Sequence, residues 1–241
     1  MNFKSLKFSA IIAIAAAAVG CGGGGGGAGD ATSATTPIST VSATGLWNGT
    51  TSTRRSLTGL ILGDGSYWVL YSAINNPNLI AGVIQGTATS SSGSFASANA
   101  KDFNLEGLGV LPATISASYT SKQSFNGSVS YTGATTSFTS TYDQAGEQSA
   151  TLATIAGSYS GQVALSAGTQ TATIAVNSSG SISGSNSGCN ITGSVTPRTD
   201  VNAYAVVLTF GAAPCYLANQ TLVGTAYLNA TTKRLYAAAL N

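Results

Sequence analysis

Residues whose types could support catalysis are scarce in this chain of 241 residues. It contains no histidine, which excludes Ser-His-Asp and Cys-His catalysis as well as histidine-ligated metal sites. A pair of carboxylates could hydrolyse a glycosidic bond, but nothing in the spacing of the acidic residues brings two of them together. The acidic residues are Asp30, Asp64, Asp102, Glu106, Asp143, Glu147 and Asp200. We therefore expect no catalytic residue, no metal and no cofactor, with a carboxylate-only hydrolase as the enzymatic alternative.

Two short polar motifs have functional interpretations that compete with structural ones. The run DFNLE at residues 102–106 places three oxygen-bearing side chains at alternate positions, as part of a calcium site would. It lacks the glycine and the other ligands of an EF-hand loop, so we favour a polar loop that binds its own backbone N–H groups. Arg54 and Arg55 could receive an anion, but neighbours on a strand point to opposite faces. A solvated turn or strand edge is the preferred interpretation.

The segment that ends at Cys21 resembles a bacterial lipoprotein signal. Lys4 and Lys7 precede an apolar run at residues 8–19, and the string AVGC closes at Cys21. This resemblance implies that residues 1–20 are a signal peptide and that Cys21 carries the lipid that anchors the protein to a membrane. Glycine rather than aspartate after the cysteine implies the outer membrane, with the periplasmic or surface-exposed face left open. The alternative is cleavage after residue 18, which would leave Cys21 as a free thiol.

The other two cysteines are predicted to form a disulfide. If Cys21 carries lipid, Cys189 and Cys215 remain as a pair in an oxidising compartment. Two buried thiols are the alternative.

Four aromatic residues are candidates for a binding surface: Trp47, Tyr67, Trp68 and Tyr71. Three of them share one expected strand, whose alternation puts Tyr67 and Tyr71 on the face opposite Trp68. One face would pack in a core, and the other could bind a ligand or form a second packed layer.

The rest of the chain predicts short antiparallel strands. Apolar residues alternate with Ser, Thr and Asn in several runs, and the sequence Gly63-Asp64-Gly65 between two apolar runs indicates a hairpin. We count about eight strands at residues 45–143 and about seven at 156–240. The best candidate for a helical turn is 98–105. The prediction is an all-β fold with two small antiparallel barrels or sandwiches after a disordered tether.

The domain organisation follows from changes in composition. Residues 21–44 comprise the lipidated cysteine and a flexible Gly/Ser/Thr tether, residues 45–146 a first β domain, and residues 154–241 a second β domain with one disulfide. GLWNG at 45–49 and GSYSG at 157–161 open the two halves alike, which suggests an internal duplication; chance similarity in a Gly-rich β protein is the alternative. Loss of Lys4 and Lys7 leaves seven basic and seven acidic residues, so no basic surface indicates nucleic-acid binding.

The tripeptide Gly45-Leu46-Trp47 resembles the G-x-W that opens the first strand of lipocalin-like barrels. That resemblance implies a Trp closing one barrel end under a basic residue from the last strand, and residues 135–143 contain no such residue. The tethered pair of barrels also resembles Gram-negative surface lipoproteins that bind host proteins. We therefore expect an outer-membrane lipoprotein that acts as a binding or interaction module for a protein or small molecule. The alternatives are a lipocalin-like carrier of a small apolar ligand and a structural envelope lipoprotein.

Overall fold

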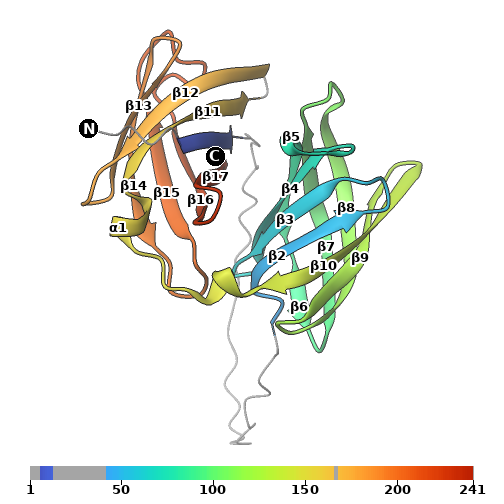
Figure 1. Ribbon diagram of the computed structural model, residues 1–241. Coiled ribbons are helices and arrows are strands. Elements are labelled where there is room, and N and C mark those ends of the chain that lie inside the picture. The colour runs from blue at the N-terminus through green and yellow to red at the C-terminus, as the bar shows by residue number, and fades with distance from the viewer. Residues whose placement is uncertain (1–5, 13–41, 166–167, 241) are drawn as a thin grey trace, which may run out of the picture.

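The computed structural model describes residues 6–12, 42–165 and 168–240, and it consists of two β-barrels that pack side by side (Figure 1). Almost all pairings are antiparallel, as the alternating apolar pattern predicts, so the all-β prediction with two barrels is confirmed. No helix in the described residues is long and apolar enough to cross a membrane. Cys21 lies outside the described residues.

The first barrel is a meander of nine strands in which consecutive strands pair with one another, except that β5 pairs with β7 instead of β6. The strands are β2 (Gly45–Thr51), β3 (Ser56–Ile61), β4 (Ser66–Ala73), β5 (Asn76–Thr87), β6 (Thr89–Ser91), β7 (Ser94–Asn104), β8 (Gly109–Thr120), β9 (Ser124–Tyr131) and β10 (Ala134–Asp143). β10 pairs back onto β2, and four residue pairs between β5 and β7 bring the other side of the sheet together. The result is a nearly closed barrel whose inward-facing residues surround a common axis.

The second barrel contains seven consecutive strands and one strand from the start of the chain. The seven are β11 (Gly157–Leu165), β12 (Gly168–Val176), β13 (Ser181–Asn186), β14 (Cys189–Pro197), β15 (Tyr204–Phe210), β16 (Thr221–Asn229) and β17 (Arg234–Leu240). β1 (Leu6–Ile12) lies between β11 and β17 and pairs with both in parallel, which closes the barrel (Figure 1). The first barrel builds its circumference from its own half of the chain, whereas the second uses a segment from the predicted signal peptide.

Removal of residues 1–20 would take β1 out of the second barrel. β11 would then pair only with β12 and β17 only with β16, which leaves two strand edges facing one another. We predict that the backbone amides of β11 and β17 exchange with solvent faster in a chain that begins at residue 21 than in the full-length chain. Hydrogen exchange followed by mass spectrometry measures this, with β13 and β14 as the internal control. Equal protection of β11 and β17 in both chains would show that the two edges pair directly.

The opening strands of the two barrels have corresponding anchors. The indole of Trp47 on β2 donates to the carbonyl of Ala43, and the hydroxyl of Tyr159 on β11 donates to the carbonyl of Ile155. Each aromatic donor therefore binds the backbone carbonyl four residues before it, and each is the third residue of its segment, GLWNG at 45–49 or GSYSG at 157–161. This equivalence favours an internal duplication.

A cluster of apolar side chains joins the barrels. It contains Leu46, Leu60, Leu62, Trp68, Leu70, Val83 and Phe103 from the first barrel and Val201, Ala203, Tyr227 and Ala238 from the second. We call it the inter-barrel cluster. Polar contacts flank it: Asp200 accepts from the backbone N–H of Gly63 and from Arg198, and the latter bond lowers the pKa of Asp200 to about 2. Because apolar burial is the main favourable term in association, this cluster holds the two barrels together.

The segment between the barrels contains two short helices, η1 (Gln144–Glu147) and α1 (Leu152–Ile155). The helical turn expected at 98–105 is wrong, because those residues belong to β7 apart from Leu105, which follows it. The predicted disulfide between Cys189 and Cys215 is present, with a sequence separation of 26. Closing a loop of that length stabilises a fold by about 3–4 kcal/mol in the chain-entropy description.

Candidate functional site

The first barrel is hollow, whereas the second is filled. A cavity of about 470 Å³ runs along the axis of the first barrel, whereas a pocket found inside the second is only about 30 Å³. Ligand pockets in proteins have volumes of roughly 300–1,000 Å³ and are mostly apolar. The same architecture therefore provides one barrel with room for a small molecule and one with a packed core.

The open end of the cavity, here called the mouth, lies where four hairpin turns meet. Its lining includes residues at or beside the β2–β3, β4–β5, β7–β8 and β9–β10 turns, represented by Thr53, Ile74, Leu108 and Thr132. Ile74 and Leu108 are 48% and 65% exposed, so apolar side chains stand in solvent at the entrance. Exposed apolar side chains that also line a cavity are a common feature of ligand entrances.

The opposite end, here called the floor, is closed by aromatic rings. Trp47 lies 5.4 Å from Phe125 between ring centroids, and Phe125 lies 5.0 Å from Phe95 in an edge-to-face arrangement. Tyr142 packs edge-on against Trp47, in the place where the lipocalin resemblance implied a basic residue. The described chain enters the first barrel beside the floor, because Ala43 binds both Trp47 and Ser90. The mouth therefore opens away from the point where the preceding residues attach.

Two tyrosines of β4 line the cavity because glycines of β5 make room for them. Tyr67 is paired across the sheet with Gly86, and Tyr71 with Gly82. A Cβ atom on Gly82 would lie 2.1 Å from the Tyr71 hydroxyl oxygen, and one on Gly86 would lie 2.7 Å from that of Tyr67. Both rings therefore lie across bare backbone of β5, and both hydroxyls reach β7.

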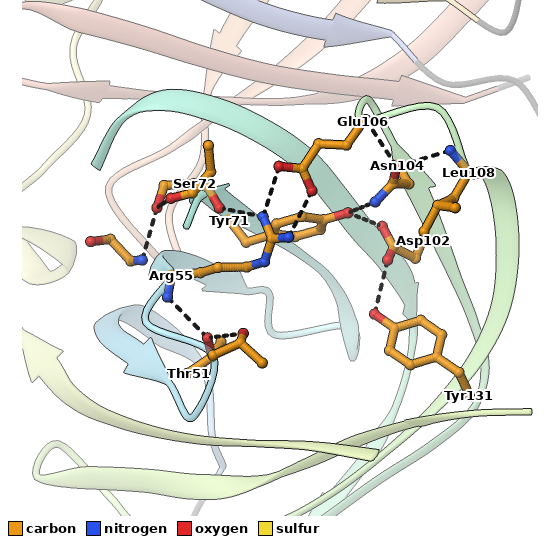
Figure 2. Close-up of polar contacts among 12 residues, drawn as sticks. Thr51, Arg55, Tyr71, Ser72, Asp102, Asn104, Glu106, Leu108 and Tyr131 are labelled. Atoms are coloured by element: carbon orange, nitrogen blue, oxygen red, sulfur yellow. Dashed lines mark hydrogen bonds and ion pairs between the residues drawn. The ribbon is translucent and has the colours of Figure 1, made fainter. Parts of the chain in front are cut away.

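The two hydroxyls reach different partners on β7. Tyr67 donates to Ser97 at 2.8 Å, and Tyr71 donates to Oδ1 of Asp102 at 2.8 Å. Tyr131 of β9 donates to Oδ2 of the same carboxyl group at 2.8 Å, so Asp102 lies between two phenols (Figure 2). Asp102 is 3% exposed, and it lines the cavity.

Burial dominates the protonation of this group. It raises the pKa of Asp102, against the opposing effects of the Tyr71 and Tyr131 hydrogen bonds and the charge of Arg55. Burial also raises the pKa of Tyr67 to about 12 and, together with the Asp102 charge, raises the pKa of Tyr71 and Tyr131 further. The phenols therefore remain protonated donors at neutral pH.

Arg55 is held beside this group by an ion pair. Its guanidinium donates to both carboxylate oxygens of Glu106, at 2.7 and 3.2 Å, and to the carbonyl of Ser72 at 2.9 Å. It also lies over the ring of Tyr71, with 5.4 Å from Cζ to the ring centroid (Figure 2). Arg55 and Asp102 are the charged residues in the lining of the cavity, and Glu106 stands behind Arg55, outside that lining.

The predicted aromatic candidates lie on two faces of the sheet, as the alternation of side chains along β4 requires. Trp47, Tyr67 and Tyr71 line the cavity, whereas Trp68 faces the opposite side of the sheet and packs in the inter-barrel cluster. Tyr131 is not among the predicted candidates, and Asp102 is considered only as part of a calcium site in the DFNLE run. A signal that could have pointed to the site is the matched spacing of Tyr67–Tyr71 and Gly82–Gly86 on neighbouring strands.

The three polar side chains of the DFNLE run have partners within the protein. Asp102 binds phenols, Asn104 accepts from the backbone N–H groups of Glu106 and Leu108, and Glu106 pairs with Arg55. In the part of the chain that the structure describes, no group of three His, Cys, Asp or Glu residues could hold a metal ion. Of the two neighbouring arginines, Arg54 is exposed in the turn with φ of 61°, while Arg55 points toward the mouth.

Comparisons with protein-family models, with curated proteins and with solved structures gave no match. The site is therefore interpreted from its own geometry: a mostly apolar cavity, an aromatic floor and a cluster of charged and hydrogen-bonding groups near the mouth.

Proposed function

We propose that this protein is an outer-membrane lipoprotein whose first barrel binds a small apolar ligand. The observation that carries the proposal is the contrast between the two barrels, with about 470 Å³ of mostly apolar space in one and about 30 Å³ in the other. Leaving apolar side chains around a space of that size forfeits packing energy, which a ligand recovers when it fills the space.

The predicted lipid on Cys21 supports a carrier or receptor held at the membrane. The described chain joins the first barrel at the floor, so an anchor and tether on that side leave the mouth free. The second barrel, which has a filled core and a large contact with the first, acts as a support rather than a second binding site.

The proposal is tested by filling the cavity from inside. Gly59 lines the cavity, and a Cβ atom there would make only an ordinary contact, 3.5 Å from Val69. We expect Gly59→Leu to abolish binding of the fluorescent apolar probe N-phenyl-1-naphthylamine, which the unmodified protein should bind. The matched control is Ser116→Leu, which adds the same side chain at an exposed position on β8.

Fluorescence of the protein itself gives an independent readout. Trp47 lines the cavity, and Trp68 lies in the inter-barrel cluster. In a Trp68→Phe background the remaining indole should respond to the probe, and the response should disappear in Gly59→Leu. Equal probe binding by Gly59→Leu and Ser116→Leu, or none by the unmodified protein, would refute a ligand in this cavity.

A further inference from the structure

The charged and hydrogen-bonding groups of the cavity are arranged in a way that selects the head group of its ligand. The floor and the middle of the cavity are lined mainly by aromatic and aliphatic side chains, whereas Arg55, Asp102 and Asn104 lie toward the mouth. An amphiphile that enters with its apolar chain toward Trp47 therefore brings its head to Asp102 and its neighbours. What those neighbours offer determines which head is accepted.

Arg55 does not offer a free positive charge. Two of its hydrogen bonds go to the carboxylate of Glu106, and a third goes to the carbonyl of Ser72. An anionic head that approached Arg55 would have to compete with a bidentate ion pair, which is among the stronger polar contacts that proteins make.

When its carboxyl group is ionised, Asp102 and the groups around it offer acceptors rather than donors. The hydroxyls of Tyr71 and Tyr131 are directed at its two oxygens, so their remaining capacity is to accept. Asn104 already donates to the Tyr71 oxygen at 3.1 Å. A head with N–H or O–H groups finds acceptors on Asp102 and Tyr131, whereas a carboxylate finds other acceptors.

The net charge of Arg55, Asp102 and Glu106 is not positive in either protonation state of Asp102. With the carboxyl group ionised, Arg55, Asp102 and Glu106 sum to −1; with it protonated, they sum to zero. Burial favours the protonated form, and neither state leaves a net positive charge for an anion.

We propose that the ligand is an amphiphile with an uncharged or cationic head that donates hydrogen bonds, and that free fatty-acid carboxylates are excluded. The proposal rests on the proposed function, because it assumes that the cavity of the first barrel takes up a ligand. It adds the chemical class of that ligand, assigned from Asp102, Tyr131 and the Arg55–Glu106 pair.

Three ligands with the same chain test the head group: dodecanol, dodecylamine and dodecanoate. Each is titrated at neutral pH against the bound naphthylamine probe in the Trp68→Phe protein. We expect dodecanol and dodecylamine to displace the probe at concentrations more than about tenfold below those needed for dodecanoate, since each tenfold corresponds to about 1.4 kcal/mol. Dodecanoate binding as tightly as dodecanol would overturn the head-group assignment and leave the cavity proposal standing. Failure of all three, together with failure of the probe, would overturn the proposed function itself.

A variant that does not touch the cavity lining makes the test sharper. Glu106→Gln removes the partner of Arg55 and leaves Asp102 and both tyrosines in place. We expect this variant to bind dodecanoate, relative to dodecanol, several-fold more tightly than the unmodified protein does. The matched control is Glu147→Gln, which breaks the exposed pair with Lys122 outside the cavity lining and should change neither ligand. Unchanged binding of dodecanoate relative to dodecanol by Glu106→Gln would contradict the role given to the Arg55–Glu106 pair.

Discussion

Replacing Asp102 with alanine should lower the free energy of unfolding by about 3 kcal/mol, because it leaves two phenol hydroxyls without their acceptor. Each buried hydrogen-bonding group that loses its partner costs roughly 1–3 kcal/mol. Tyr71 is 7% exposed and Tyr131 is partly buried, so solvent replaces the lost acceptor poorly. Urea denaturation of the purified protein, followed by circular dichroism, measures the difference. A change within about 0.5 kcal/mol, typical of a surface substitution, would show that the phenols do not depend on this carboxyl group.

Asparagine at position 102 has nearly the shape of aspartate but no ionisable group, so it tests the effect of the charge alone. Asp102→Asn keeps one acceptor oxygen and nearly the same volume, so we expect a smaller loss, on the order of 1 kcal/mol. It also removes a titrating group whose pKa is raised in the folded protein by burial. The two variants together distinguish loss of a hydrogen-bond acceptor from loss of a charge.

The raised pKa of Asp102 predicts the direction in which the free energy of unfolding changes with pH. Because the folded protein holds the Asp102 proton more tightly than the unfolded chain does, this group stabilises the fold most below the unfolded pKa, about 3.9. That contribution is lost as pH rises through the folded pKa. The contributions of the other ionisable groups cancel when the free energy of unfolding of Asp102→Asn is subtracted from that of the unmodified protein. We expect this difference to decrease as pH rises from about 4, because the unmodified protein loses the contribution of Asp102. Parallel stability curves for the two proteins would contradict a raised pKa.

Alternation was sufficient to predict most of the strands and the faces of β4. The hairpin at Gly63-Asp64-Gly65 joins β3 to β4, and Tyr67 and Tyr71 lie on the face opposite Trp68. These features depend on local geometry: side chains alternate along a strand, and glycine allows a tight turn. Local geometry can be recognised in the sequence.

The position of Asp102 could not be predicted in the same way, because a bulge changes the alternation within β7. Phe95 and Ser97 are buried at odd positions, whereas Ala100 and Asp102 are buried at even ones. Between Ser97 and Ala100 the strand contains one residue more than its partner β8, which carries Ile115 and Ala113 opposite them. One extra residue reverses which side chains face inward. A regular alternation rule therefore assigns residue 102 to the wrong face of the sheet.

The hollow interior also could not be predicted from composition. Both halves are rich in Ser, Thr, Gly and aliphatic residues, and their opening strands have equivalent anchors at Trp47 and Tyr159. Whether a barrel is filled depends on which inward side chains meet across its axis, and this is determined by register across all strands at once. The volume difference between the barrels appears only when the side chains are placed.

Substituting alanine for Gly82 should be the most damaging of the small changes at the site. The new methyl group would lie 2.1 Å from the hydroxyl oxygen of Tyr71 and 2.3 Å from its Cζ atom, far below any contact that proteins tolerate. The ring cannot stay under Arg55 with its hydroxyl on Asp102, so it must move into the cavity. Overpacking costs about 1–3 kcal/mol and the lost hydrogen bond about 1 kcal/mol, so we expect a loss of about 2–4 kcal/mol together with weaker probe binding.

The control for this prediction is the same substitution at Gly59 of β3, a glycine that lines the cavity. Gly59→Ala introduces a methyl group at an ordinary contact distance, 3.5 Å from Val69, and should change stability by less than about 1 kcal/mol. A double-mutant cycle identifies the cause: in a Tyr71→Val background, where the ring is absent, Gly82→Ala should cost much less than in the unmodified protein. If Gly82→Ala costs the same in both backgrounds, its effect comes from the backbone of β5 rather than from displacing Tyr71. In that case the pairing of tyrosines with glycines would not be what holds Tyr71 against Asp102.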